Sequence, residues 1–192
     1  DYNDYVLVVS NVTPAGEAPP PGADVVRIDA GGSGYTAVNG DVFAPDDLSL
    51  ITGETMTNTK NFDVGDSDDD PLYLAYRFGE NFTYNIPVAN GTYTVRLHHA
   101  EIFQTATGQR IFSVNVEGGQ GVTTNLDLVQ EVGFGTALIN EYTDIEVTDG
   151  AMSIAFSFSE DNALIQGIEV IGTSANPNSA PTIAISAPVD GS

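Results

Sequence analysis

The side chains able to do chemistry are mostly carboxylates, and their densest run extends from Asp63 to Asp70. Within this run, Asp66, Asp68 and Asp70 occupy alternate positions, which is the spacing of carboxylate ligands in calcium loops. The run lacks the glycine and the distal glutamate of an EF-hand loop. We therefore favour a solvated acidic loop, and keep a structural Ca²⁺ site as the alternative and as the one cofactor that the sequence suggests.

Glu101 is a second carboxylate of interest, at the end of a predicted strand. It has the same parity as Val95 and Leu97, so an unbroken strand directs its side chain inward. A buried carboxylate requires charged or hydrogen-bonding partners, which Arg77, Arg96 or backbone amides can supply. We expect Glu101 to be a structural brace rather than a ligand contact.

The only two histidines, His98 and His99, are neighbours on the same predicted strand. Adjacent strand residues point to opposite faces, so these two rings cannot bind one metal ion together. We interpret His99 as a partly buried residue with satisfied hydrogen bonds.

The sequence offers little for catalysis. Gly31-Gly32-Ser33-Gly34 is followed by Tyr35 and does not complete a G-x-S-x-G nucleophile motif. Glycoside hydrolysis requires two carboxylates on either side of one bond, and Glu101 with Asp161 is the only pair that we can nominate. We expect a protein that is not an enzyme, and glycosidase is the third interpretation.

Composition restricts the class of partner. The chain has 192 residues, with 27 acidic and 5 basic side chains and a net charge of −22. Such a field repels nucleic acid and anionic lipid, so neither is an expected partner. The chain has no cysteine and no apolar run long enough to insert into a membrane. These features are typical of a secreted or cell-surface bacterial protein without disulfides.

Alternating apolar residues predict the elements that position these side chains. An Asn-Gly pair at 90–91 between two alternating runs predicts a β-hairpin. The long segment 46–70 is polar and irregular, and no amphipathic helix longer than 126–132 is expected. The pattern predicts an all-β fold, an antiparallel two-sheet β-sandwich. The predicted strands lie at 25–29, 82–86, 93–97, 112–116, 145–147, 152–158 and 165–171.

The ends of the chain differ in composition from its middle. Residues 1–23 read as a lead-in strand at 5–9 and a proline-rich connector. Residues 24–172 form the predicted sandwich, and residues 173–192 read as a linker and the start of an immunoglobulin-like module. We therefore expect the chain to be part of a larger multidomain protein, linked covalently to neighbouring modules.

Several motifs, in order along residues 24–172, resemble the malectin domain. They are Arg27-Ile28-Asp29-Ala30-Gly31-Gly32, Leu72-Tyr73, Tyr84-Asn85-Ile86-Pro87-Val88, Gly91-Thr92-Tyr93, Ala100-Glu101, Arg110-Ile111-Phe112-Ser113-Val114 and Gly167-Ile168-Glu169-Val170. The resemblance implies a jelly-roll, galactose-binding-like sandwich that binds glucose-containing oligosaccharides in a cleft between loops, through aromatic side chains and one aspartate.

The resemblance also implies particular binding residues. The aspartate falls on Asp161, and two aromatic positions fall on Phe78 and Phe103, which are tyrosines in animal malectins. A third aromatic position is Gln104 here, and a fourth is Met56, or Phe62 if a gap intervenes. Beside Asp161, Asn162 offers a further polar group for sugar hydroxyls.

Two functions remain open. The first is a non-catalytic module that binds a neutral oligo- or polysaccharide, with flat rings against the sugar and polar groups on its hydroxyls. The alternative is a structural or adhesive spacer domain that has lost sugar binding. They differ in whether Phe78, Phe103 and Asp161 converge on an open cleft or lie under packed loops.

Overall fold

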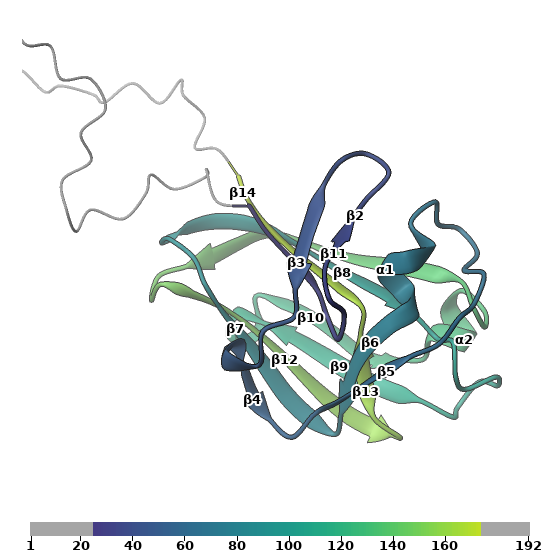
Figure 1. Cartoon of the computed structure of the whole chain (residues 1–192). Helices are drawn as coiled ribbons and strands as arrows, with labels where there is room; N and C mark the ends of the chain where they lie inside the picture. The colour runs from purple at the N-terminus through teal and green to yellow at the C-terminus, as the bar shows by residue number, and fades with distance from the viewer. Residues whose placement is uncertain (1–24, 174–192) are drawn as a thin grey trace, which may run out of the picture.

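The structure is a computed structural model that describes residues 25–173, and it has two main β-sheets with a smaller third sheet at one end (Figure 1). The first sheet has six strands, in the order β11-β8-β14-β1-β3-β2. Only the β1–β3 pairing within it is parallel. Its strands are β1 (Val25–Asp29), β2 (Tyr35–Thr36), β3 (Val42–Pro45), β8 (Gly91–Ala100), β11 (Ala137–Val147) and β14 (Gly167–Gly172).

The second sheet has five antiparallel strands, in the order β10-β9-β12-β7-β4. Two short 3-10 helices, η1 (Leu48–Leu50) and η2 (Glu117–Gly119), precede its two edge strands. Its strands are β4 (Ile51–Gly53), β7 (Asn81–Pro87), β9 (Ile111–Val116), β10 (Gly121–Leu126) and β12 (Ala151–Glu160).

The third sheet has three antiparallel strands in the order β13-β6-β5, with bounds Ala163–Ile165, Ala75–Gly79 and Met56–Thr59. The helix α1 (Asp70–Leu74) leads directly into β6, and Pro71 in its first turn fits the start of a helix. The other helix, α2 (Leu128–Glu131), begins after Asp127, whose carboxylate caps the amide of Gln130.

One hydrophobic core joins the two large sheets, because each contributes its inward-facing alternate residues. Within it, Phe82 stacks on Phe156, with ring centroids 4.7 Å apart. Other fully buried members are Tyr84, Ile86, Tyr93, Val95, Leu97, Phe112, Val116, Met152, Ile154 and Ile168. The predicted all-β sandwich is therefore confirmed.

The predicted hairpin at 90–91 is wrong. β7 pairs with β12 and β4, whereas β8 pairs with β11 and β14, so the two strands belong to different sheets. Neither Asn90 nor Gly91 has the positive φ that a tight hairpin turn requires. Instead, the Asn90 side chain donates to the carbonyl of Thr148, and the segment forms a corner between the sheets.

Two other expectations about strands also need correction. The segment 46–70 is not wholly irregular, because it contains η1, β4 and β5. The strand expected at 165–171 is divided at Gln166 into β13 and β14, which lie in different sheets. The buried amide of Gln166 bonds both the N–H and the carbonyl of Ala100, taking the place of backbone partners at the break.

The expected lead-in strand at 5–9 and the expected immunoglobulin-like start after residue 173 lie outside the described residues, so both stay predictions. Within residues 25–173, no helix has the length and apolar character needed to cross a membrane.

Candidate functional site

The three-stranded sheet presents one face whose residues are set by strand register. Met56 lies directly opposite Phe78, and Asn58 lies opposite Tyr76. Cross-strand partners point to the same side of a sheet, so these four side chains share one face. Tyr76 is buried and its ring centroid lies 5.6 Å from that of Phe78, which is half-buried, whereas Met56 is 60 % exposed.

A loop that starts at Glu101 borders this face and is fixed by that residue. One oxygen of the Glu101 carboxylate accepts the backbone N–H groups of Phe103 and Gln104, both at 2.8 Å. The other oxygen lies 2.6 Å from Nε of Arg110, and Glu101 is only 1 % exposed. The expectation of a buried structural brace is confirmed, although its charged partner is Arg110.

The arginines that were expected beside Glu101 have other partners. Arg77 pairs with Asp46 at 2.6 Å in the interior, and Arg96 pairs with Glu141 at the surface. Asp46 also accepts the Tyr84 hydroxyl and thus links the segment before η1 to β6 and β7.

The Phe103 ring projects from the loop and is 55 % exposed. Lys60 lies beside it, with Nζ 5.7 Å from the Phe103 centroid and 5.8 Å from that of Phe134, within reach of a cation–π contact. The same ammonium donates to the carbonyl of Ile102. Sequence reasoning missed Lys60, although it is the only lysine in the chain.

Asp161 occupies the turn between β12 and β13 in a left-handed conformation, with φ of 54°. Its carboxylate accepts from Nε2 of Gln104 at 2.9 Å and lies 3.0 Å from Nη2 of Arg110. It also accepts from Nδ2 of Asn162 at 3.1 Å, and Arg110 donates to the Asn162 carbonyl. These bonds bring Gln104, Asp161 and Asn162 together and tie the Phe103 loop to this turn.

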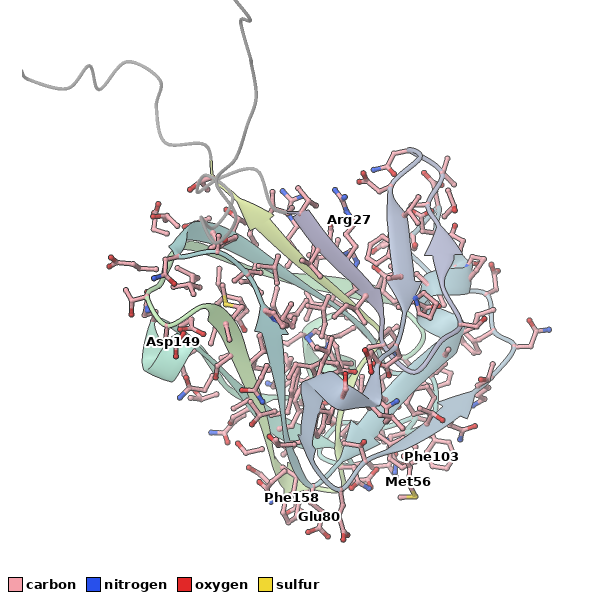
Figure 2. The ribbon with its side chains drawn as sticks, turned by 60° about the vertical axis from the view of Figure 1, so that its left-hand side comes forward. Arg27, Met56, Glu80, Phe103, Asp149 and Phe158 are labelled. Carbon is pink, nitrogen blue, oxygen red and sulfur yellow. The ribbon has the colours of Figure 1, made fainter. Side chains whose placement is uncertain are left out.

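The six predicted residues therefore come from one end of the sandwich. Met56 and Phe78 are paired on the small sheet, and beside it Gln104 and Asn162 each donate to the Asp161 carboxylate. Figure 2 labels Met56 and Phe103 in the lower part of its view.

The alternative aromatic, Phe62, is half-buried and lies on the Phe134 side of Lys60. Its ring packs edge-to-face against Phe134, with centroids 5.1 Å apart, and covers Gly135, where a Cβ would lie 2.2 Å from the ring. Met56, and not Phe62, is the residue opposite Phe78.

The structure does not gather the predicted calcium ligands. Among residues 25–173, no three His, Cys, Asp or Glu side chains form a group able to hold a metal ion, so Asp66, Asp68 and Asp70 do not make one. The intervening Asp69 accepts the Tyr35 hydroxyl at 2.7 Å and the amide of Val38 at 2.8 Å.

The histidines lie in different surroundings. His98 contacts Glu169 through Nε2 at 2.9 Å and Tyr73 through Nδ1 at 3.0 Å. His99 is fully buried, not partly buried as expected, and burial lowers its pKa to about 3. Its Nδ1 lies 3.2 Å from the carbonyl of Leu164, while Nε2 has no hydrogen-bond partner among the described residues.

The one pair of carboxylates nominated for hydrolysis is not arranged for it. Glu101 and Asp161 both bind the guanidinium of Arg110, one at Nε and the other at Nη2. One arginine thus engages both carboxylates, and the burial of Glu101 keeps it from a substrate. The pair cannot flank a glycosidic bond.

The β-sandwich, with this group of residues at one end, is typical of the malectin-like class of carbohydrate-binding domains. The Malectin domain profile matches residues 24–184, and the chain belongs to the Malectin domain family. The resemblance inferred from the motifs is thereby confirmed.

The chain is also similar in sequence to known malectins. The chain is 28 % identical to human malectin over 152 residues, which cover 77 % of this chain and 51 % of that protein. It is 28 % identical to Malectin-B of Xenopus laevis over 131 residues, 66 % of this chain and 47 % of the relative. The chain thus spans about half the length of these relatives.

Solved structures share the fold at lower identity. The ANXUR1 extracellular domain from Arabidopsis thaliana aligns with a TM-score of 0.65 and 18 % identity, over 77 % of this chain and 47 % of that chain. A Bacteroides uniformis beta-glucuronidase aligns with a TM-score of 0.67 and 19 % identity, over 77 % of this chain and 18 % of that chain. At these identities the likeness concerns the fold alone.

Proposed function

We propose that the chain is a non-catalytic carbohydrate-binding module of a larger secreted bacterial protein, and that it binds a neutral, glucose-containing oligo- or polysaccharide. The ligand lies against Phe103, Phe78 and Met56, and its hydroxyls bond Gln104, Asp161 and Asn162. The observation that carries the proposal is the exposed Phe103 ring beside the hydrogen-bonded group of Gln104, Asp161 and Asn162.

The physical basis is a combination of flat apolar surface and fixed polar groups, which orients a small ligand in most binding sites. Each hydrogen bond contributes about 0.5–1.5 kcal/mol, and a few of them correspond to micromolar to millimolar affinity. The absence of the two tyrosine hydroxyls of animal malectins is expected to change the preferred sugar or linkage.

Two features of the relatives support the extracellular location and the larger parent protein. The matched ANXUR1 structure is described as an extracellular domain, and the chain corresponds to about half of human malectin. The net charge of −22 favours an uncharged glycan over an anionic one.

One observation favours the spacer function instead. The Asp161 carboxylate already has donors from Gln104, Arg110 and Asn162, which leaves it fewer acceptor positions for a sugar. In a spacer, this network would only hold the Phe103 loop against the Asp161 turn, and the protein would bind no glycan.

A glycan array followed by calorimetry with neutral gluco-oligosaccharides separates the two functions. We expect Phe103→Ala to weaken binding of the selected oligosaccharide about tenfold or more, because an exposed ring in a binding site carries a large share of the affinity. Val122→Ala serves as a control, since Val122 is 53 % exposed on the edge strand β10 and lies outside the site. A folded protein that binds no glycan on the array would support the spacer, and full binding by Phe103→Ala would refute the site.

A further inference from the structure

Three connections lead from one to the other of the five-stranded and three-stranded sheets, and they lie around one groove. They join β4 to β5, β6 to β7, and β12 to β13, and each runs from a strand of one sheet to a strand of the other. Backbone pairing stops at these crossings, and the space between them is a groove of about 860 Å³. Its lining residues come from all three connections and include Glu54, Glu80 and Asn162.

Two glycines bring the connections into backbone contact. A Cβ on Gly53, whose φ is 101°, would lie 2.4 Å from the carbonyl oxygen of Asn81. A Cβ on Gly79 would lie 2.5 Å from the carbonyl oxygen of Glu54. Only glycine permits both approaches, so the wall of the groove is formed by closely packed backbone and is preformed.

The groove is continuous with the candidate sugar site. Met56 and Asn162 belong to both, and Asn162 follows Asp161 directly. Beyond the groove, the Phe158 amide donates to the Glu80 carbonyl, so the backbone of β12 lies beside that wall, and the Phe158 side chain is exposed. Figure 2 shows Phe158 and Glu80 together on the same lower edge as Met56 and Phe103.

The chemistry of the groove suits an uncharged polyhydroxyl chain. Glu54, Glu80 and Asn81 offer oxygen acceptors and an amide, and Leu48 and Met56 offer apolar surface. Of the described residues that line it, none is lysine or arginine. Its carboxylates would repel uronates and phosphates, and its volume lies within the range of about 300–1,000 Å³ of small-molecule sites.

We propose that this groove is a second subsite, which holds further neutral pyranose units of the same glycan chain whose first units lie against Phe103 and Phe78. The inference rests on the proposed function and extends it. It predicts a module that binds the interior of a chain, with hydroxyls of the additional units donating to the carboxylates of Glu54 and Glu80.

The test is the dependence of affinity on chain length. Calorimetry uses gluco-oligosaccharides of two, four and six units, in α1,4 and β1,3 linkage, with the wild-type chain and with Glu80→Ala/Asn81→Ala. We expect the wild type to bind the longer sugars about tenfold more tightly than the disaccharide. The double variant should lose this gain and keep its disaccharide affinity.

Glu146→Ala is the matched control, because Glu146 is exposed on β11, outside the residues that line the groove, and its substitution should preserve the gain. Thermal denaturation establishes that each variant is folded. Equal affinity for all lengths, or a gain that survives in the double variant, overturns the second subsite and leaves the proposed function intact. Failure of every sugar to bind the folded wild type overturns both.

Discussion

Arg110 is the residue on which the geometry of the site depends most. Its guanidinium joins the buried carboxylate of Glu101 to Asp161 and to the carbonyl of Asn162. The sequence placed Arg110 within a family motif but did not predict this role. The pairing partner of a buried carboxylate depends on how loops pack together, and the local sequence pattern does not predict that packing.

Replacing Arg110 with methionine should lower the free energy of unfolding by about 3–5 kcal/mol, because it leaves the Glu101 charge buried without its partner. Urea denaturation measures the change. The matched control is Arg96→Met, which breaks the exposed pair with Glu141 and should cost at most about 1 kcal/mol. Similar losses in the two variants would contradict the assigned importance of the buried pair.

His99 provides a prediction about pH. Burial lowers its folded-state pKa to about 3 from the ordinary value of 6.5, so the unfolded chain binds a proton that the folded chain does not. Stability associated with His99 is complete above about pH 6.5 and is lost as the pH falls toward 3, at up to roughly 1.4 kcal/mol per pH unit.

The measurement is the urea-unfolding free energy of wild type and His99→Gln between about pH 6.5 and pH 5, above the usual range of carboxylate titration. The wild type should lose stability over this interval, and the variant should lose less. Equal slopes in the two proteins would show that His99 is not the group responsible.

At the scale of elements, the small sheet β13-β6-β5 decides where the site lies. β6 and β5 bring Phe78 and Met56 side by side, and β13 follows the Asp161 turn. The residues of β5 and β6 are polar or lack clear alternation, so their sequence does not predict strands. Their strand geometry comes from pairing with each other and not from intrinsic propensity.

The close crossing at Gly79 gives a prediction for these elements. Gly79→Ala places a methyl group within 2.5 Å of the Glu54 carbonyl, so the connections must separate. We expect a loss of about 1–3 kcal/mol in unfolding free energy, as for overpacked interiors. Gly65→Ala is the control, since its Cβ meets only ordinary contacts at 3.5 Å or more and should change stability by less than about 0.5 kcal/mol. A Gly79 variant as stable as the control would contradict the close approach.

For the whole molecule, charge is the dominant surface property. All four arginines make ion pairs within the described structure, and Lys60 bonds a carbonyl beside two rings. With 27 acidic side chains against 5 basic ones, the carboxylates far outnumber the cationic groups that could pair with them. Mutual repulsion therefore destabilises the folded state.

Added salt should stabilise the protein. Raising NaCl from about 0.01 M to about 1 M shortens the Debye length from about 30 Å to about 3 Å and screens this repulsion. A gain of about 1 kcal/mol would raise the melting temperature by roughly 2–4 °C at pH 7. The effect should shrink near pH 4, where carboxylates are partly protonated. A melting temperature that is unchanged or lower at high salt would contradict this account.

The sequence by itself determined which side chains face the core, since a strand alternates its faces every residue and the apolar pattern at 93–97, 112–116 and 152–156 records that alternation directly. Through the family motifs, it also suggested Phe103, Gln104 and Asp161 as sugar-binding residues. Only the tertiary structure decided that β7 and β8 belong to different sheets, that Arg110 is the partner of Glu101, and that a groove extends from the site. These features depend on contacts between residues far apart in the chain, and the free energy of such contacts is settled by the packing of the whole fold and not by any single segment.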